Sequence, residues 1–148
     1  MTILDQIGKC YRPSSKTKIT NGSAIQKSLQ YFTGLKNFEI NAIYSLRNAF
    51  FHDFSLYNRN GSDPSLQHVF TVDNHPPNNV VILPATQWDG NMATRSTSNT
   101  TYINLKALGD LVEQIYMDLI SVEAAGNLSL DLPNGSTELL YKYIFAHL

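Results

Sequence analysis

The sequence predicts a mainly α-helical fold: an up-down bundle with a β-hairpin inserted between two long helices. Residues 39–58 and 105–122 repeat apolar side chains every three or four positions, which is typical of amphipathic helices. Between them, residues 67–73 and 80–83 are rich in β-formers and flank a turn-like segment. A chain of 148 residues is long enough for one sizeable core. We therefore expect a single domain over 1–148, with the hairpin insertion at about 66–84.

The first part of the chain predicts two shorter helices. Residues 2–10 suit a short helix, and residues 11–23 read as a loop because they contain a proline, several serines and an Asn-Gly pair. Ser23 is a suitable N-cap for a helix that continues to about Phe32. The long helix 39–58 follows.

The middle of the chain carries the strand signals. Residues 67–73 alternate between polar and apolar side chains, and residues 80–83 form a second short apolar run. The Asn-His-Pro-Pro-Asn-Asn segment between them predicts a turn, so the two runs are expected to pair antiparallel. Residues 84–101 are polar and irregular, and residues 101–104 suit a third strand.

The last part predicts two further helices. Asn104 is a plausible cap for the helix that starts at residue 105, and Gly126 is a plausible stop. A final helix is expected over about 136–147, after a Pro-Asn-Gly segment.

Arg47 interrupts the apolar face of the helix 39–58. At about 100° per residue, five apolar side chains lie within roughly 60° of it: Ile40, Ile43, Phe50, Phe51 and Phe54. Burying a guanidinium without a partner is costly, so that face must pair with the arginine or open onto a cleft or an interface. Asn48 and His52 lie about 100° and 140° round the helix from Arg47, along one edge of the apolar stripe.

Composition excludes several classes of protein. The chain is 43% hydrophobic and 11% aromatic, which fits a folded globular protein rather than a disordered one. Its apolar runs are too short for a membrane span, and no secretory signal is visible. The single cysteine, Cys10, excludes an internal disulfide and a cysteine-cluster metal site. We expect a cytoplasmic protein with no membrane partner, no cofactor and no metal site.

Common catalytic motifs are also missing. The sequence has no glycine-rich phosphate loop and no paired-histidine metal motif. His68 and His75 are interpreted as surface residues. Ser45 and Ser55 lie near His52 on the predicted helix, but no nucleophile elbow surrounds them, so a serine hydrolase is not expected.

Charge is distributed unevenly along the chain. The net charge is −1, which argues against broad electrostatic capture of nucleic acid. Residues up to Phe38 carry a net +5, and the remainder carries −6. The basic segment, which includes Lys16 and Lys18, is either a solvated loop or an edge that attracts phosphate.

The spacing of Arg47, Asn48 and His52, Arg-Asn-x-x-x-His inside an aromatic-rich helix, resembles the signature of the HEPN superfamily. That signature is an arginine, often with a polar residue directly after it, followed at short spacing by a histidine. The order helix, hairpin, helix over about 23–147 is similar to that of several small prokaryotic HEPN proteins. The resemblance implies an HEPN-like bundle whose site forms where two such helices meet across a two-fold homodimer.

The same resemblance implies metal-independent cleavage of RNA by its own 2′-hydroxyl group. His52 would take or give a proton, Arg47 would stabilise charge on the phosphate, and Asn48 would orient either of them. The products would be a 2′,3′-cyclic phosphate and a 5′-hydroxyl. The substrate-binding candidates beside these three are Tyr44, Ser55, Lys16 and Lys18. Such a ribonuclease would act as a toxin or a defence component, with an antitoxin protein as a candidate partner.

Two other interpretations remain open. A non-catalytic HEPN domain would bind a nucleotide or a protein partner, and Arg47 would then pair with an acid on the later helix: Glu113, Asp118 or Glu123. Alternatively, a helical interaction module outside this superfamily would use the hairpin as its contact edge.

Overall fold

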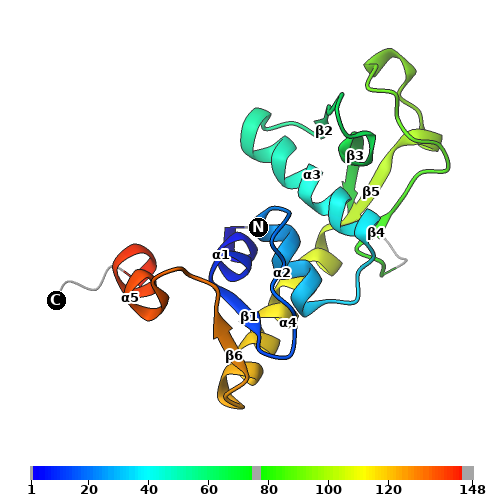
Figure 1. Cartoon of the computed structure of the whole chain (residues 1–148). Helices are drawn as coiled ribbons and strands as arrows, with labels where there is room; N and C mark the ends of the chain where they lie inside the picture. Colours follow the sequence, from blue (N-terminus) through cyan, green and yellow to red (C-terminus); the bar gives the residue numbers. More distant parts are fainter. Residues whose placement is uncertain (1, 75–77, 145–148) are drawn as a thin grey trace. The chain divides into compact units, whose positions relative to one another are not determined.

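The computed structural model describes residues 2–74 and 78–144, and these form a mixed α/β fold (Figure 1). Helices account for 52% and strands for 14%, and the described residues form five helices and two sheets. The predicted mainly α, HEPN-like up-down bundle is therefore wrong. Two compact units are present: unit 1 contains residues 1–34 and 114–148, and unit 2 contains residues 35–113.

Unit 1 consists of helices and one antiparallel ribbon. Its elements are α1 (Thr2–Cys10), β1 (Tyr11–Pro13), α2 (Ala24–Phe32), the second half of α4 (Leu105–Ala124), β6 (Leu128–Leu130), α5 (Gly135–Leu139) and the π-helical turn η4 (Leu140–Ile144). The buried apolar side chains come from several of these elements: Leu4, Ile7, Cys10, Ile25, Leu29, Tyr31, Ile115 and Leu132.

The pairing of α1 with α2 confirms both short helices predicted near the N-terminus. Ser23 caps α2 through a capping box. Its backbone N–H donates to Gln26 Oε1 at 2.9 Å, and Gln26 N–H donates to Ser23 Oγ at 3.4 Å. Gly8 lets the backbone of α1 approach that of α2, because a Cβ at this position would lie 1.8 Å from the carbonyl oxygen of Ala24.

The β1–β6 ribbon lies in a segment predicted to be a loop. Tyr11 is opposite Leu130 in its antiparallel register, and the Arg12 side chain reaches Asp131 Oδ1 at 3.2 Å. The ribbon joins residues that are more than a hundred positions apart, so no local pattern signals it. The final predicted helix, 136–147, is α-helical only over Gly135–Leu139, and its last residues lie outside the described part.

Unit 2 places one long helix beside a four-stranded sheet (Figure 1). Its elements are α3 (Asn37–Asp53), β2 (Tyr57–Asn58), β3 (His68–Asp73), β4 (Val81–Ile82), β5 (Thr101–Asn104), the first half of α4, and the 3₁₀ turns η1 (Pro64–Leu66), η2 (Met92–Thr94) and η3 (Thr97–Asn99). The strand order is β2-β3-β5-β4. The core contains residues of the helix and of the sheet: Ile40, Ile43, Leu46, Ala49, Val69, Phe70, Val81, Trp88, Ile103 and Leu108.

The predicted β-hairpin does not form. β3 pairs parallel with β5, and β4 pairs antiparallel with β5, so β5 lies between the two strands that were expected to pair. β5 buries Thr101 and Ile103 and has a neighbour on each side, whereas β4 contains only two residues. Part of the predicted turn, residues 75–77, lies outside the described residues. The third strand predicted at 101–104 is confirmed.

The helix predicted over 39–58 ends earlier. Phe54 is its C-cap and adopts the left-handed conformation, with φ of 48°, and its N–H donates to the carbonyl of Ala49. Tyr57 and Asn58 then form β2, which pairs antiparallel with β3. The helix predicted from residue 105 is confirmed, including its cap, because Ala107 N–H donates to Asn104 Oδ1 at 3.0 Å.

Candidate functional site

The last turns of α3 carry the predicted catalytic residues on a partly exposed surface. The Arg47 guanidinium lies over the Phe51 ring, with its central carbon 4.5 Å from the ring centroid. Its Nη1 donates to Asn48 Oδ1 at 3.3 Å. Arg47 and Phe51 are four residues apart, so both project from the same side of the helix. Asn48 and His52 are neighbours for the same reason, which places Asn48 between the guanidinium and the imidazole along the helix surface.

The predicted apolar stripe of α3 has two environments. Ile40 and Ile43, in its first half, are buried in the core of unit 2. Phe50 and Phe51, in its second half, are exposed, Phe51 to 56%, and Phe54 beyond the helix is 92% exposed. Arg47 is half-buried and lies at the change from the buried half to the exposed half. The arginine therefore belongs to the edge of the core rather than its middle.

Two of the predicted binding residues are close to this surface. Tyr44 is a half-buried residue of α3. Ser55 follows the helix cap, and its hydroxyl donates to the Tyr57 carbonyl at 3.0 Å. Its backbone N–H donates to the Ala49 carbonyl at 3.2 Å. Ser55 thus stabilises the chain reversal after α3, which is a structural role.

Lys16 and Lys18 belong to unit 1, so no single unit brings them together with Arg47 and His52. Both are exposed. The Lys18 ammonium lies 3.8 Å from Asp131 Oδ1, a carboxylate that also binds Arg12. A cavity of about 290 Å³ in unit 1 is lined by Lys18 and Asp131 together with other residues: Gly8, Lys9, Gly22, Ala24 and Lys27. The predicted phosphate-attracting edge is thus partly neutralised by Asp131.

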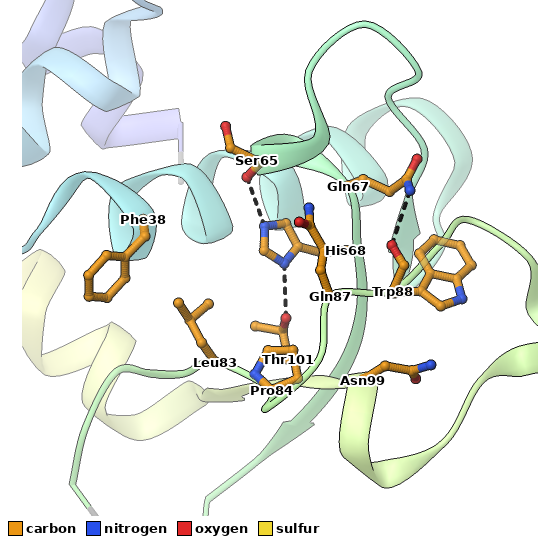
Figure 2. Close-up of a pocket in the computed structure, with 10 residues that line it drawn as sticks. All are labelled: Phe38, Ser65, Gln67, His68, Leu83, Pro84, Gln87, Trp88, Asn99 and Thr101. Carbon is orange, nitrogen blue, oxygen red and sulfur yellow. Dashed lines mark hydrogen bonds between the residues drawn. The ribbon is translucent and has the colours of Figure 1, made fainter.

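A second cavity, of about 230 Å³, lies in unit 2 beside His68 (Figure 2). Ten side chains line it, from α3, η1, β3, β5 and the segment 83–99. Figure 2 shows Phe38 and Leu83 on one side of His68, and Gln67 and Trp88 on the other. Trp88 is only 1% exposed, and its indole N–H donates to the Asn91 carbonyl at 2.9 Å.

The hydrogen bond to Ser65 selects one tautomer of the neutral His68 ring. Nε2 lies 3.1 Å from the carbonyl oxygen of Ser65, which only accepts, so Nε2 carries the proton. Nδ1 of the neutral ring therefore accepts from the Thr101 hydroxyl at 2.9 Å. Burial lowers the pKa of His68, an effect that the Ser65 hydrogen bond opposes in part. The ring also stacks on Phe70, with centroids 5.4 Å apart.

The prediction that His68 is a surface residue is wrong, because it is only 8% exposed. The alternation of side chains in this segment of the sequence could have predicted the burial of His68. In β3, side chains alternate between faces, so His68 projects on the same face as the buried Phe70. Most of the remaining cavity residues, those of the segment 83–99 among them, lie outside regular helices and strands, and nothing in their local sequence marks them.

In the described residues, metal-ligating side chains are not grouped, and the Cys10 thiol is buried. Among residues 2–74 and 78–144, no three His, Cys, Asp or Glu side chains are grouped as metal ligands would be. Burial raises the pKa of the Cys10 thiol, and the nearby Glu138 raises it further. In the same part of the chain, no helix combines the length and apolarity that crossing a membrane requires.

Comparison of the chain with protein-family models, curated proteins and solved structures finds no significant match. Any function therefore has to be argued from the residues themselves.

Proposed function

We propose that the chain is a metal-independent endoribonuclease that binds single-stranded RNA at the exposed end of α3. The observation that carries the proposal is the Arg47 guanidinium lying on Phe51 and held by Asn48, with the exposed His52 on the next turn. An arginine and exposed aromatic rings are the groups that bind the phosphates and stack on the bases of single-stranded RNA. Phe51, which is 56% exposed and lies beside the Arg47 guanidinium, supplies the ring.

The chemistry needs Arg47, His52, a second imidazole and the RNA itself. The imidazole of His52 takes the proton of the ribose 2′-hydroxyl, whose oxygen then attacks the adjacent phosphorus. The bond from phosphorus to the 5′-oxygen breaks, and that oxygen takes a proton from a second imidazole. The products are a 2′,3′-cyclic phosphate and a 5′-hydroxyl. Arg47 stabilises the added negative charge on the phosphate.

A two-fold homodimer would supply the second imidazole from the His52 of another copy. The exposed rings of Phe50 and Phe54 are the apolar surface that such an interface would cover. A strict monomer by light scattering at tens of micromolar would count against this assembly.

A non-catalytic function is the second candidate. It is favoured by the contacts of Arg47 with Phe51 and Asn48 inside its own helix, because a structural role would account for them. The exposed end of α3 would then bind a nucleotide or a protein partner without cleaving it. The third interpretation, an interaction module that presents a hairpin edge, loses its basis because β3 and β4 do not pair.

The test is cleavage of several single-stranded RNAs by the purified protein in EDTA. His52→Ala should lower the rate by roughly 10²- to 10⁴-fold, as removal of a positioned acid or base does. Arg47→Ala should abolish detectable cleavage while changing stability by no more than about 1 kcal/mol, because its stacking is partly exposed.

Arg59→Ala is the matched control. Arg59 also lies over an aromatic ring, that of Tyr57 at 5.5 Å, but it is outside the Arg47–His52 group. Its removal should leave cleavage unchanged. If the wild-type protein cleaves none of the RNAs, or His52→Ala cleaves as fast, the ribonuclease proposal fails and the non-catalytic function replaces it.

A further inference from the structure

The cavity beside His68 has walls without formal charge. Its ten lining residues include no aspartate, glutamate, lysine or arginine. The one titratable group among them, His68, is only 8% exposed, and burial, which lowers its pKa below the ordinary value, favours the neutral ring. Burying a charged ligand there would leave that charge unpaired, so the cavity favours an uncharged molecule.

The walls are also held in place before any ligand arrives. Gln67 Nε2 donates to the Trp88 carbonyl at 3.1 Å, and Gln87 Nε2 donates to the carbonyl of Pro64. The Asn99 amide donates to the Thr94 carbonyl at 2.9 Å and accepts from Ser96 N–H at 2.8 Å. A preformed pocket costs little ordering entropy when it binds a ligand.

Hydrogen-bonding capacity remains on two of these amides. The side-chain oxygens of Gln67 and Gln87 accept no hydrogen bond from the described residues. Among the described residues that are not exposed, no buried side-chain nitrogen or oxygen lacks a partner, so the Gln67 oxygen is accessible to solvent or a ligand. Gln87 is itself an exposed residue. Both oxygens can accept from ligand N–H groups, and each amide keeps a second N–H to donate.

The volume of the cavity and its aromatic lining limit further which ligands it can bind. At about 230 Å³ the cavity is smaller than the roughly 300–1,000 Å³ of sites for drug-sized molecules, so it suits a single ring system. Phe38 is 48% exposed at one side of the cavity, the Lys36 ammonium lies 5.7 Å from its ring centroid, and a ring of this exposure can stack on a planar ligand. From the neutral walls, the amide groups and this ring, we propose that the cavity binds one nucleobase, as a free nucleoside or as an unstacked base of a single strand.

The single tryptophan of the chain provides the readout, because Trp88 lines the cavity. The experiment titrates the full chain with adenosine, guanosine, cytidine and uridine up to about 10 mM, a range that detects affinities typical of weak small ligands. Binding is followed by Trp88 fluorescence and by the indole N–H cross-peak in NMR spectra. Ribose 5-phosphate, which lacks a base, is the negative control, and a single-stranded oligonucleotide is titrated in parallel.

Three variants separate binding from stability. Phe38→Ala removes the stacking face and should weaken binding at least about fivefold, as truncating one base-stacking aromatic does. Phe38→Tyr keeps the ring and should bind as the wild type does. Met92→Ala removes a side chain of similar exposure outside the cavity and should also bind normally. Urea unfolding of each variant verifies that the fold is retained.

The outcomes test whether the cavity binds a nucleobase and whether that base comes from a free nucleoside or from a single strand. Saturable Trp88 changes with at least one nucleoside, lost in Phe38→Ala, support it. The same changes with the oligonucleotide alone also support it and identify a base within a strand. The proposal is overturned if neither probe perturbs Trp88, if ribose 5-phosphate acts equally, or if Phe38→Ala binds unchanged. This inference does not depend on ribonuclease activity, because binding is measured without cleavage and the Arg47 and His52 variants should bind normally.

Discussion

Replacing Gly8 with alanine tests the packing of α1 against α2 most directly. Helix propensity alone predicts a gain, because alanine in a helix interior is favoured over glycine by about 1 kcal/mol. The structure predicts the opposite. A Cβ at Gly8 would lie 1.8 Å from Ala24 O and 2.7 Å from Ser28 N, both of them backbone atoms of α2.

The size of the effect follows from how far the helices must separate. Real Cβ atoms essentially never approach closer than 3.0 Å, so one helix must move by at least 1.2 Å, the difference between 3.0 and 1.8 Å. The colliding atoms belong to a helix backbone and cannot rotate away. The movement would loosen buried Leu4 and Ile7 against Ile25 and Leu29. Overpacking typically costs about 1–3 kcal/mol, and a clash with backbone atoms lies at the upper end of that range, so the net loss should be about 2 kcal/mol.

Gly109→Ala is the matched control. Gly109 lies inside α4, and a Cβ there would meet nothing within 4 Å. Only the higher helix propensity of alanine should then act, so the free energy of unfolding of this variant should rise by up to about 1 kcal/mol. Urea unfolding followed by circular dichroism at 222 nm measures both. If Gly8→Ala proves as stable as the wild type, α1 and α2 do not pack backbone to backbone at Gly8 and the argument is refuted.

Two further outcomes are expected in the same assay. Because burial lowers the pKa of folded His68 below its ordinary value of 6.5, the unfolded chain binds more protons between these two values. Stability should therefore fall as pH drops below about 6.5, by at most about 1.4 kcal/mol per pH unit, and His68→Gln should remove that dependence; an unchanged slope in the variant would contradict it. Phe54→Gly should stabilise by about 1 kcal/mol, because the residue has φ of 48° and its side chain is 92% exposed. A loss of stability would show that Phe54 packs against something in solution.

Helices with explicit end signals were predictable from the sequence. α2 starts after the Ser23 capping box, and α4 starts after Asn104, as their sequences indicate. The end of α3 was not predictable. Phe54 continues the apolar spacing of the helix, and a left-handed conformation at a bulky residue has no local sequence signal. Counting Phe54 in the helix therefore lengthened α3 beyond Asp53.

The pairing of the strands in the sheet could not be predicted from the periodicity of the sequence. Consecutive strands pair in most proteins, which favoured a hairpin of β3 with β4. The choice between β4 and β5 as the neighbour of β3 depends on burial in three dimensions. β5 offers two buried side chains, Thr101 and Ile103, and Thr101 also donates to His68 on β3. The two-residue β4 offers one, Val81, and so lies at the edge.

The mixed fold also changes what Arg47 implies. In a helical bundle, an arginine on the apolar stripe of a central helix would have to meet a partner helix or a second copy. A helix that packs on one sheet needs only part of its length buried, and in α3 that part contains Ile40 and Ile43. Arg47 then lies at the edge of the core, where stacking on Phe51 suffices to hold it. The homodimer proposal therefore depends on the exposed rings of Phe50 and Phe54, and no longer on the arginine.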